Sequence, residues 1–248
     1  MLNKENFKLQ FGDWFPLMEK LFDNGTMDSI YGTLKTEGSR MSISPLSSDT
    51  YKAFEKCKRS ELKCVFLGLA PYASFTYDNK PVSDGLAFSC SVTNKEQPSL
   101  KLVWDAIFDD LNTEGKRYTD LSYLAHQGVL MLNVALTAKR DKPESHIALW
   151  QPFMKYLFEE VLSLHTGLPI IYFGKQAAKM KSFSLPFGHY NKIVEHPAAA
   201  ARDNRPFNHE NIFTWINNLL KENNNQQIKW IVNESEHEQI IDEFKCPF

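Results

Sequence analysis

The feature of this sequence that most restricts its fold is a set of four short strand-like runs that alternate with longer amphipathic segments. The first, Cys64 to Leu67, is apolar and has the length and the β-branched or aromatic content of a buried strand. Strands that alternate with helices indicate a parallel sheet covered on both faces. We therefore predict an α/β fold, a three-layer α/β/α sandwich around a central four-stranded parallel sheet. The predicted strands cover residues 63–68, 129–134, 168–173 and 190–194.

The segments between these runs carry apolar residues at helical spacing. Two helices are expected within residues 12–35, separated near Asn24 and Gly25. Ser99 and Asp120 are candidate N-caps of two further helices, because their side-chain oxygens can accept from free backbone N–H groups. The other predicted helices cover residues 99–112, 120–127, 149–165, 175–182 and 208–223, and loops are predicted at 38–50 and 138–146.

The chain has 248 residues, 43% of them hydrophobic, which suits a globular domain with a large core. We predict a single domain over residues 1–230 and a C-terminal extension over residues 231–248. The segment HEQIIDEF in this extension fits a weak helix or a tail that docks on a protein partner, although disorder is the expectation.

Several classes of protein are disfavoured by composition. No apolar run approaches the roughly 18 residues of a membrane span, and the N-terminus lacks a secretory apolar core, so we expect a cytoplasmic protein. The four cysteines show no C-x-x-C spacing, so neither a metal site nor a cofactor is predicted. Cys64 and Cys90 are expected to pack as small apolar residues. We also expect a monomer.

The net charge of −2 argues against a broad electrostatic coating of nucleic acid. It leaves open DNA binding through a few cations beside one groove. A solvated charged surface is the alternative for each such cation. The candidates are Lys139, Arg140, Lys175, Lys179, Lys181, Arg202 and Arg205.

The first apolar run ends at Gly68, and Pro71 follows where the chain must turn. Open α/β sheets form their ligand sites at the carboxyl ends of the strands. This stretch is therefore a candidate site, although taken alone it equally fits a core strand and its loop.

Four segments resemble, in order, the motifs of the uracil-DNA glycosylases of the family 1 type. Within residues 68–89, GLAPYA and GLAFS are similar to the family's G-Q-D-P-Y-H and G-L-x-F-S. Residues 97–100 resemble its proline-serine loop, and residues 128–137 its G-V-L-L-L-N-x-x-L-T strand. Residues 195–200, EHPAAA, stand where the family has H-P-S-P-L-S. The resemblance covers about residues 10 to 230, and four ordered motifs are more specific than one.

The resemblance implies an enzyme that flips a nucleotide out of DNA and grips its base. Phe88 matches the residue on which the base stacks, and Tyr72 the wall that crowds C5 of a pyrimidine. Asn133 matches the amide that reads the base edge, which suits a group with both donor and acceptor. His196 matches the imidazole that donates to the base carbonyl. Outside this register, the aromatics would more often be core residues, Asn133 a ladder or turn residue and His196 a strand end.

Further positions follow from the same resemblance. Leu69 and Ala70 are expected beside the substrate, and Ser89 and Ser99 near phosphates. The other residues expected to contact DNA are Gly174, Lys175, Ala198, Ala200 and Arg202.

Three departures from the family pattern surround the pocket. Ala70 replaces the aspartate that orients the attacking water, Ala73 replaces a histidine, and Ala200 matches the leucine that wedges into the base stack. These large-to-small changes favour a substrate bulkier than uracil, and they equally fit the decay of an unused site.

The loop between Tyr72 and Phe88 is also longer than in the family, and it contains Tyr77, Asp78 and Asp84. Asp84 is a candidate to orient water in place of the missing carboxylate. An aspartate that caps the turn before a glycine is the alternative.

The leading hypothesis is a DNA glycosylase that hydrolyses the N-glycosidic bond of uracil or of a modified pyrimidine. Hydroxymethylated or glucosylated cytosine in viral DNA, attacked as host defence, fits the larger pocket. The alternative is an inactive protein of the same fold that binds DNA or a replication or repair partner, as Ala70 and the acidic extension suggest. Action on a free nucleoside is a third, weaker hypothesis.

Overall fold

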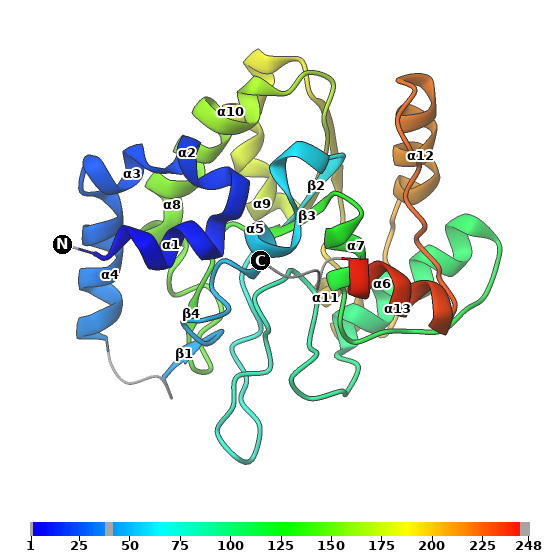
Figure 1. Cartoon of the computed structure of the whole chain (residues 1–248). Coiled ribbons are helices and arrows are strands. Elements are labelled where there is room, and N and C mark those ends of the chain that lie inside the picture. Colours follow the sequence, from blue (N-terminus) through cyan, green and yellow to red (C-terminus); the bar gives the residue numbers. More distant parts are fainter. Residues whose placement is uncertain (1, 38–41, 244–248) are drawn as a thin grey trace.

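The computed structural model describes residues 2–37 and 42–243. Its centre is a parallel four-stranded sheet with the strand order β3-β2-β5-β6 (Figure 1). Every residue of β2, β3 and β5 is buried, which is why these strands read as continuous apolar runs. Each predicted strand is confirmed. The strands are β2 Cys64–Gly68, β3 Val129–Asn133, β5 Pro169–Phe173 and β6 Tyr190–Val194.

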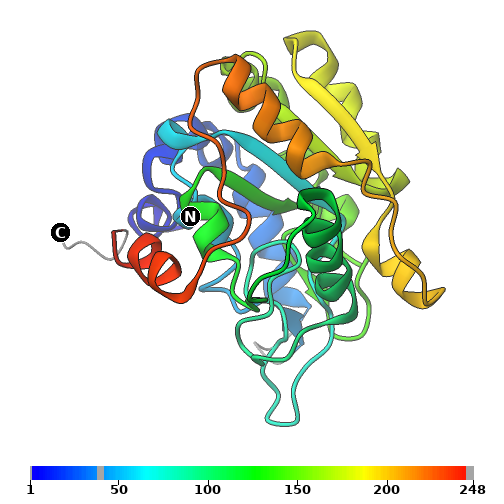
Figure 2. The same ribbon diagram turned by 90° about the vertical axis from the view of Figure 1, so that its right-hand side faces the viewer.

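Helices cover both faces of this sheet and give the predicted three layers (Figures 1 and 2). One face is covered by α1 Lys4–Phe11, α2 Phe15–Met18, α3 Lys20–Asp23, α4 Thr26–Thr36 and α8 Ile147–Tyr156, with α5 Lys52–Lys56 packed on α1. The other face is covered by α6 Pro98–Leu111, α7 Ser122–His126 and α12 Ile212–Glu222. Short helices α9 Gly174–Ala177 and α10 Lys181–Ser184 follow β5, and α11 Pro197–Arg202 follows β6.

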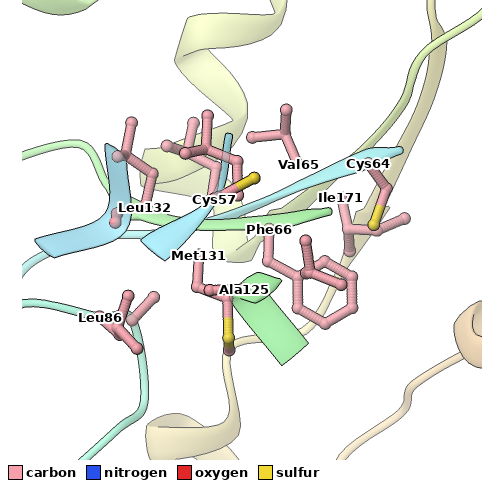
Figure 3. Packing of buried hydrophobic residues seen from close by; sticks show 14 of the residues in the cluster. Cys57, Cys64, Val65, Phe66, Leu86, Ala125, Met131, Leu132 and Ile171 are labelled. Atoms are coloured by element: carbon pink, nitrogen blue, oxygen red, sulfur yellow. The ribbon is translucent and has the colours of Figure 1, made fainter. Parts of the chain in front are cut away.

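The buried side chains form one continuous cluster that includes both faces of the sheet. On one face, Phe66 of β2 stacks on Trp230 at 5.7 Å between ring centroids and lies edge-on to Phe173 at 5.3 Å. Figure 3 shows Cys57 and Cys64 within this apolar packing. Cys64 and Cys90 are free thiols without exposed surface, as predicted.

The break between helices that was predicted near Gly25 is confirmed, because Gly25 adopts a left-handed conformation, with φ 79°, as the N-cap of α4. Two other helix starts differ from the prediction. Ser99 is not an N-cap, because Gln97 takes that position and Pro98 starts α6 with its preset φ angle. The last predicted helix begins only at Ile212, because Asn211 before it has a φ of 53°.

Two further findings correct the predicted loops and the predicted tail. The two predicted loops, 38–50 and 138–146, each contribute one short strand to an antiparallel pair, β1 Ile43–Ser44 with β4 Ala138–Lys139. The predicted disorder is wrong for much of the extension, since helix α13 Glu234–Glu243 packs on α7. Trp230, 1% exposed, anchors the chain just before this helix. Residues 244–248 lie outside the described residues.

Candidate active site

A cavity of about 690 Å³ opens where the strands of the sheet end. Asn133 is the last residue of β3, Gly174 follows β5, and His196 lies just beyond β6. Parallel strands bring their carboxyl ends to one edge of the sheet, so residues far apart in sequence meet here. The residues predicted at this site that line the cavity are Leu69, Ala70, Tyr72, Phe88, Ser99, Asn133, Gly174, Lys175, His196, Ala198 and Arg202.

Asn133 presents a polar amide in an otherwise apolar strand. The residue is 7% exposed, and its side chain makes no hydrogen bond to any of the residues that the structure describes. Gly68 lies opposite on β2, and a Cβ atom there would come within 2.4 Å of Asn133 Oδ1. Gly68 therefore leaves the room that the amide occupies. An unpaired, nearly buried amide facing a cavity is suited to a ligand that offers both donor and acceptor.

His196 is held as a neutral hydrogen-bond donor. Its Nδ1 atom accepts from the backbone N–H of Ala198 at 3.1 Å, which leaves the ring proton on Nε2. Burial, and secondarily the charge of Arg202, lower the pKa of His196 to about 4. At neutral pH the imidazole can thus donate from Nε2 without carrying a charge. Gly174 allows the close packing beneath this ring, since a Cβ atom on Gly174 would lie 3.0 Å from His196 Cβ.

Phe88 lies in a strained backbone conformation at the cavity. Its φ of 67° falls in the left-handed region, which bulky residues rarely adopt. The Tyr72 hydroxyl donates to the Phe88 carbonyl at 3.0 Å and holds the peptide in place. The Phe88 ring packs edge-on against Phe173 at 4.8 Å and lies 6.0 Å from the His196 ring. Strain of this kind clusters at ligand sites, and here it fixes one aromatic face beside the imidazole.

Ser99 is oriented by the same contacts. Because Tyr72 gives its only hydroxyl proton to Phe88, the Ser99 hydroxyl donates to Tyr72 at 2.9 Å. Ser99 is 5% exposed and lines the cavity where α6 begins. Burial raises the pKa of Tyr72 well above its usual value, so the phenol remains protonated and this chain of hydrogen bonds persists.

The prediction that Asp84 orients water in the cavity is wrong. Asp84 does not line the cavity, and its carboxylate accepts from Ser89 Oγ at 2.6 Å and Ser91 Oγ at 2.5 Å. It also pairs with Lys52 Nζ at 3.2 Å and accepts from the backbone N–H of Leu86 at 3.3 Å. The alternative, an aspartate that caps the turn before Gly85, describes this residue. Asp84 fixes the loop that carries Phe88.

Two residues predicted to meet DNA are turned inward. Ala200 has no exposed surface, because its small side chain lies where α11 packs on α6. It therefore cannot act as a wedge or touch DNA. Ser89 is also fully buried and is bound to Asp84, so its hydroxyl is not directed at a phosphate.

The predicted cations divide into paired and unpaired groups. Arg205 pairs with Glu195 and Asp203, and Lys139 pairs with Glu37. Lys175 and Arg202, in contrast, lie at the cavity and form no ion pair with a described carboxylate. These two side chains are the ones available there for a phosphate backbone.

Sequence reasoning missed Glu144, which is the one carboxylate among the described residues that line the cavity. Its side chain is exposed and has no hydrogen bond or ion pair to a described residue. Glu144 belongs to the loop at 138–146, in which only Lys139 and Arg140 were considered, as candidates for DNA binding. The loop follows β3, so its place at the carboxyl edge of the sheet was the available signal. The amides of Gln97 and Gln176, also missed, line the same cavity.

Among the described residues, no helix is long and apolar enough to cross a membrane, and no group of three or more side chains could hold a metal ion. The cavity is lined by aromatic, amide, imidazole and carboxylate side chains at the carboxyl edge of the parallel sheet.

Comparison with known proteins identifies the class. A model of the uracil DNA glycosylase superfamily matches residues 54–221. The uracil-DNA glycosylase of Amoebophilus asiaticus is 30% identical over 88% of this chain and 96% of its own. That of Brevibacillus brevis is 28% identical over 88% of this chain and 93% of its own. The chain therefore belongs to the uracil DNA glycosylase superfamily.

The fold agrees with solved structures. The crystal structure of mimivirus uracil-DNA glycosylase superposes with a TM-score of 0.82, at 20% identity, over 93% of this chain and 90% of that chain. At this level of identity the likeness establishes the shared α/β/α architecture.

Proposed function

We propose that this protein is a DNA glycosylase that hydrolyses the N-glycosidic bond of a flipped pyrimidine nucleotide. The observation that carries the proposal is the pairing, in one cavity, of the unbonded Asn133 amide with the neutral His196 donor. The names of the relatives, uracil-DNA glycosylases, support the same chemistry.

Each residue of the cavity has a separate role in the proposed reaction. The flipped base stacks on Phe88, and the Asn133 amide pairs with its hydrogen-bonding edge. As the C1′–N1 bond breaks, the bonding electrons move onto the base, and His196 Nε2–H stabilises the charge that develops on a ring carbonyl. A water oxygen then bonds to C1′ and releases a proton, and the departed base takes up a proton from solvent. The product is an abasic site.

A carboxylate beside the sugar would stabilise the positive charge that develops on C1′ as the bond breaks. Ala70 has no charge to offer, and Asp84 is engaged outside the cavity. Glu144 is the carboxylate that lines the cavity. We assign to Glu144 the role of orienting the water and accepting its proton.

The pocket favours a base larger than uracil. Ala70 and Ala73 line the cavity beside Tyr72 with small side chains, and they leave space on that side of the base. A modified pyrimidine, such as hydroxymethylated or glucosylated cytosine in viral DNA, suits this space. Uracil remains the second substrate to test, and the enzyme would act in the cytoplasm as repair or as defence.

The proposal is tested by an abasic-site assay. Purified protein is incubated with duplex and single-stranded DNA that carries uracil, thymine, hydroxymethylcytosine or glucosylated hydroxymethylcytosine, and alkali then cleaves abasic sites. We expect cleavage of one substrate, at least about 10²-fold slower in Asn133→Ala and His196→Ala. Glu144→Gln should lower kcat about 10²-fold, whereas Asp141→Asn in the same loop should leave it unchanged.

Absence of cleavage on every substrate, with the protein folded, would contradict the proposed function. Ala70 would then favour the competing hypothesis, a protein of this fold that binds DNA without reacting. Under that hypothesis duplex DNA is bound and Asn133→Ala binds it as tightly as the natural chain.

A further inference from the structure

The long loop after Tyr72 forms a small hairpin over residues 74–82. The backbone N–H of Val82 donates to the Ser74 carbonyl at 3.0 Å, and that of Thr76 donates to the Lys80 carbonyl at 2.8 Å. Phe75 and Pro81 form an antiparallel bridge between these two bonds. The hairpin therefore has a defined shape of its own. It projects beyond the rest of the molecule in two perpendicular views (Figures 1 and 2).

Contacts from the loop after β4 brace this hairpin. The Arg140 guanidinium lies over the Phe75 ring, 4.3 Å from its centroid, and Arg140 Nη2 donates to Asn79 Oδ1 at 2.8 Å. The backbone N–H of Asp141 donates to the Ala73 carbonyl at 2.9 Å. The bracing loop also carries Glu144, which lines the cavity. The hairpin is thus held in a fixed relation to the site.

The base of the hairpin is part of the cavity wall, because Ala73 and Ser74 line it. With strands that rise about 3.3 Å per residue, Tyr77 at the tip stands on the order of 10 Å beyond this rim. That distance places an aromatic ring outside the cavity, at the level where duplex DNA would lie if one nucleotide were flipped into it.

Tyr77 itself is fully exposed, with 105% of its reference surface accessible. It makes no hydrogen bond or ring contact with a described residue. The charges beside it on the tip, Asp78 and Lys80, pair with each other at 2.9 Å and cancel. An aromatic side chain on a rigid, electrically balanced tip presents its ring to a flat apolar partner such as a base.

Helix α11 offers no wedge in its own part of the site. Ala198 and Ala199 present only methyl groups to the cavity, and Ala200 is buried. Flipping a nucleotide leaves a gap in the base stack, and proteins that distort duplexes fill such gaps with apolar side chains.

We propose that Tyr77 is the side chain that inserts into the DNA duplex beside the flipped nucleotide. This inference rests on the proposed DNA glycosylase function and adds a DNA-contacting element to it. The partner is duplex DNA, because flipping a nucleotide leaves a gap that a side chain can fill only within the base-paired stack of a duplex. Around the hairpin, Arg140 and Lys142 are cationic and Asp141 and Glu144 are anionic, so the contact of the hairpin itself with DNA depends on the aromatic ring rather than on net charge.

The test compares two DNA probes with the full-length protein. One is a duplex that carries a tetrahydrofuran abasic analogue opposite 2-aminopurine, and the other is the same abasic strand alone. We expect Tyr77→Ala to raise the Kd for the duplex about tenfold and to abolish quenching of 2-aminopurine, with single-strand binding unchanged. Tyr77→Phe should retain binding and quenching. Tyr190→Ala, which removes a 41% exposed tyrosine at the other end of β6, is the matched control.

The proposal would be overturned if Tyr77→Ala and the natural chain bound the duplex equally and quenched 2-aminopurine equally. The hairpin would then contact another partner, such as a protein. A loss that is as large on the single strand would overturn the proposal too. If the natural chain excises no base but still shows the Tyr77-dependent quenching, the insertion stands and the glycosylase proposal fails. If it does not bind the duplex, both fail.

Discussion

At the scale of single residues, the polar side chains of the cavity depend on neighbouring residues that carry no reactive group of their own. Asn133 can face a ligand because Gly68 has no side chain. His196 can pack directly against the backbone of Gly174 for the same reason. The same holds for the proton on His196, which the backbone N–H of Ala198 assigns to Nε2. Small residues and backbone groups therefore set the state of the two polar side chains.

Gly68→Ala tests this dependence. The new Cβ atom would lie 2.4 Å from Asn133 Oδ1, so the amide must move. We expect kcat/KM for base excision to fall about 10²-fold, because a displacement of about 1 Å is enough to misalign a bound substrate. The matched control is Gly32→Ala in α4, where a Cβ atom meets nothing within 4 Å. Equal activity of the two variants would show that the position of the Asn133 amide does not matter.

At the scale of elements, the strands were predictable and the loops were not. Each strand of the parallel sheet is a short, fully or partly buried run, so its apolar residues mark it almost to the residue. Asp84 was expected at the cavity and lies outside it, while Glu144, for which no role was predicted, lines the cavity. The path of a loop depends on distant partners such as Lys52, which pairs with Asp84. The order of α13 depends on Trp230, which the sheet buries. Local sequence carries no record of such contacts.

The prediction at this scale concerns the loop over residues 83–91 and the effect of Asp84→Asn on the stability of the protein. This change leaves Lys52 unpaired, with its side chain only 15% exposed, and removes the charge that binds Ser89 and Ser91. We expect the free energy of unfolding to fall by about 2–3 kcal/mol, which lowers the Tm by about 5–10 °C.

Activity below the transition should change only a few-fold, because Asp84 does not line the cavity. Asp78→Asn, which removes an exposed ion pair with Lys80, should leave the Tm unchanged and serves as the control. A variant with normal Tm and lost turnover would instead restore Asp84 to a catalytic role.

At the scale of the whole molecule, buried histidines make the free energy of unfolding depend on pH. Burial lowers the pKa of His126 and of His196 to about 4, and it also lowers the pKa of His165, His189 and His237. His165 and His189 additionally have buried ring nitrogens without hydrogen-bond partners. The folded protein thus keeps these rings neutral where the unfolded chain would protonate them.

The consequence is a loss of stability between pH 6.5 and pH 5. Over this interval the unfolded chain binds protons and the native state does not, so the free energy of unfolding falls as the pH falls. The stabilisation is complete above the ordinary histidine pKa of 6.5 and is lost as the pH drops toward about 4. His126 alone, 8% exposed, accounts for roughly 2 kcal/mol at pH 5. Calorimetry at pH 7.5, 6.0 and 5.0 measures the decline, and His126→Gln should reduce it. A Tm that is constant across this range would show that these rings titrate normally in the native protein.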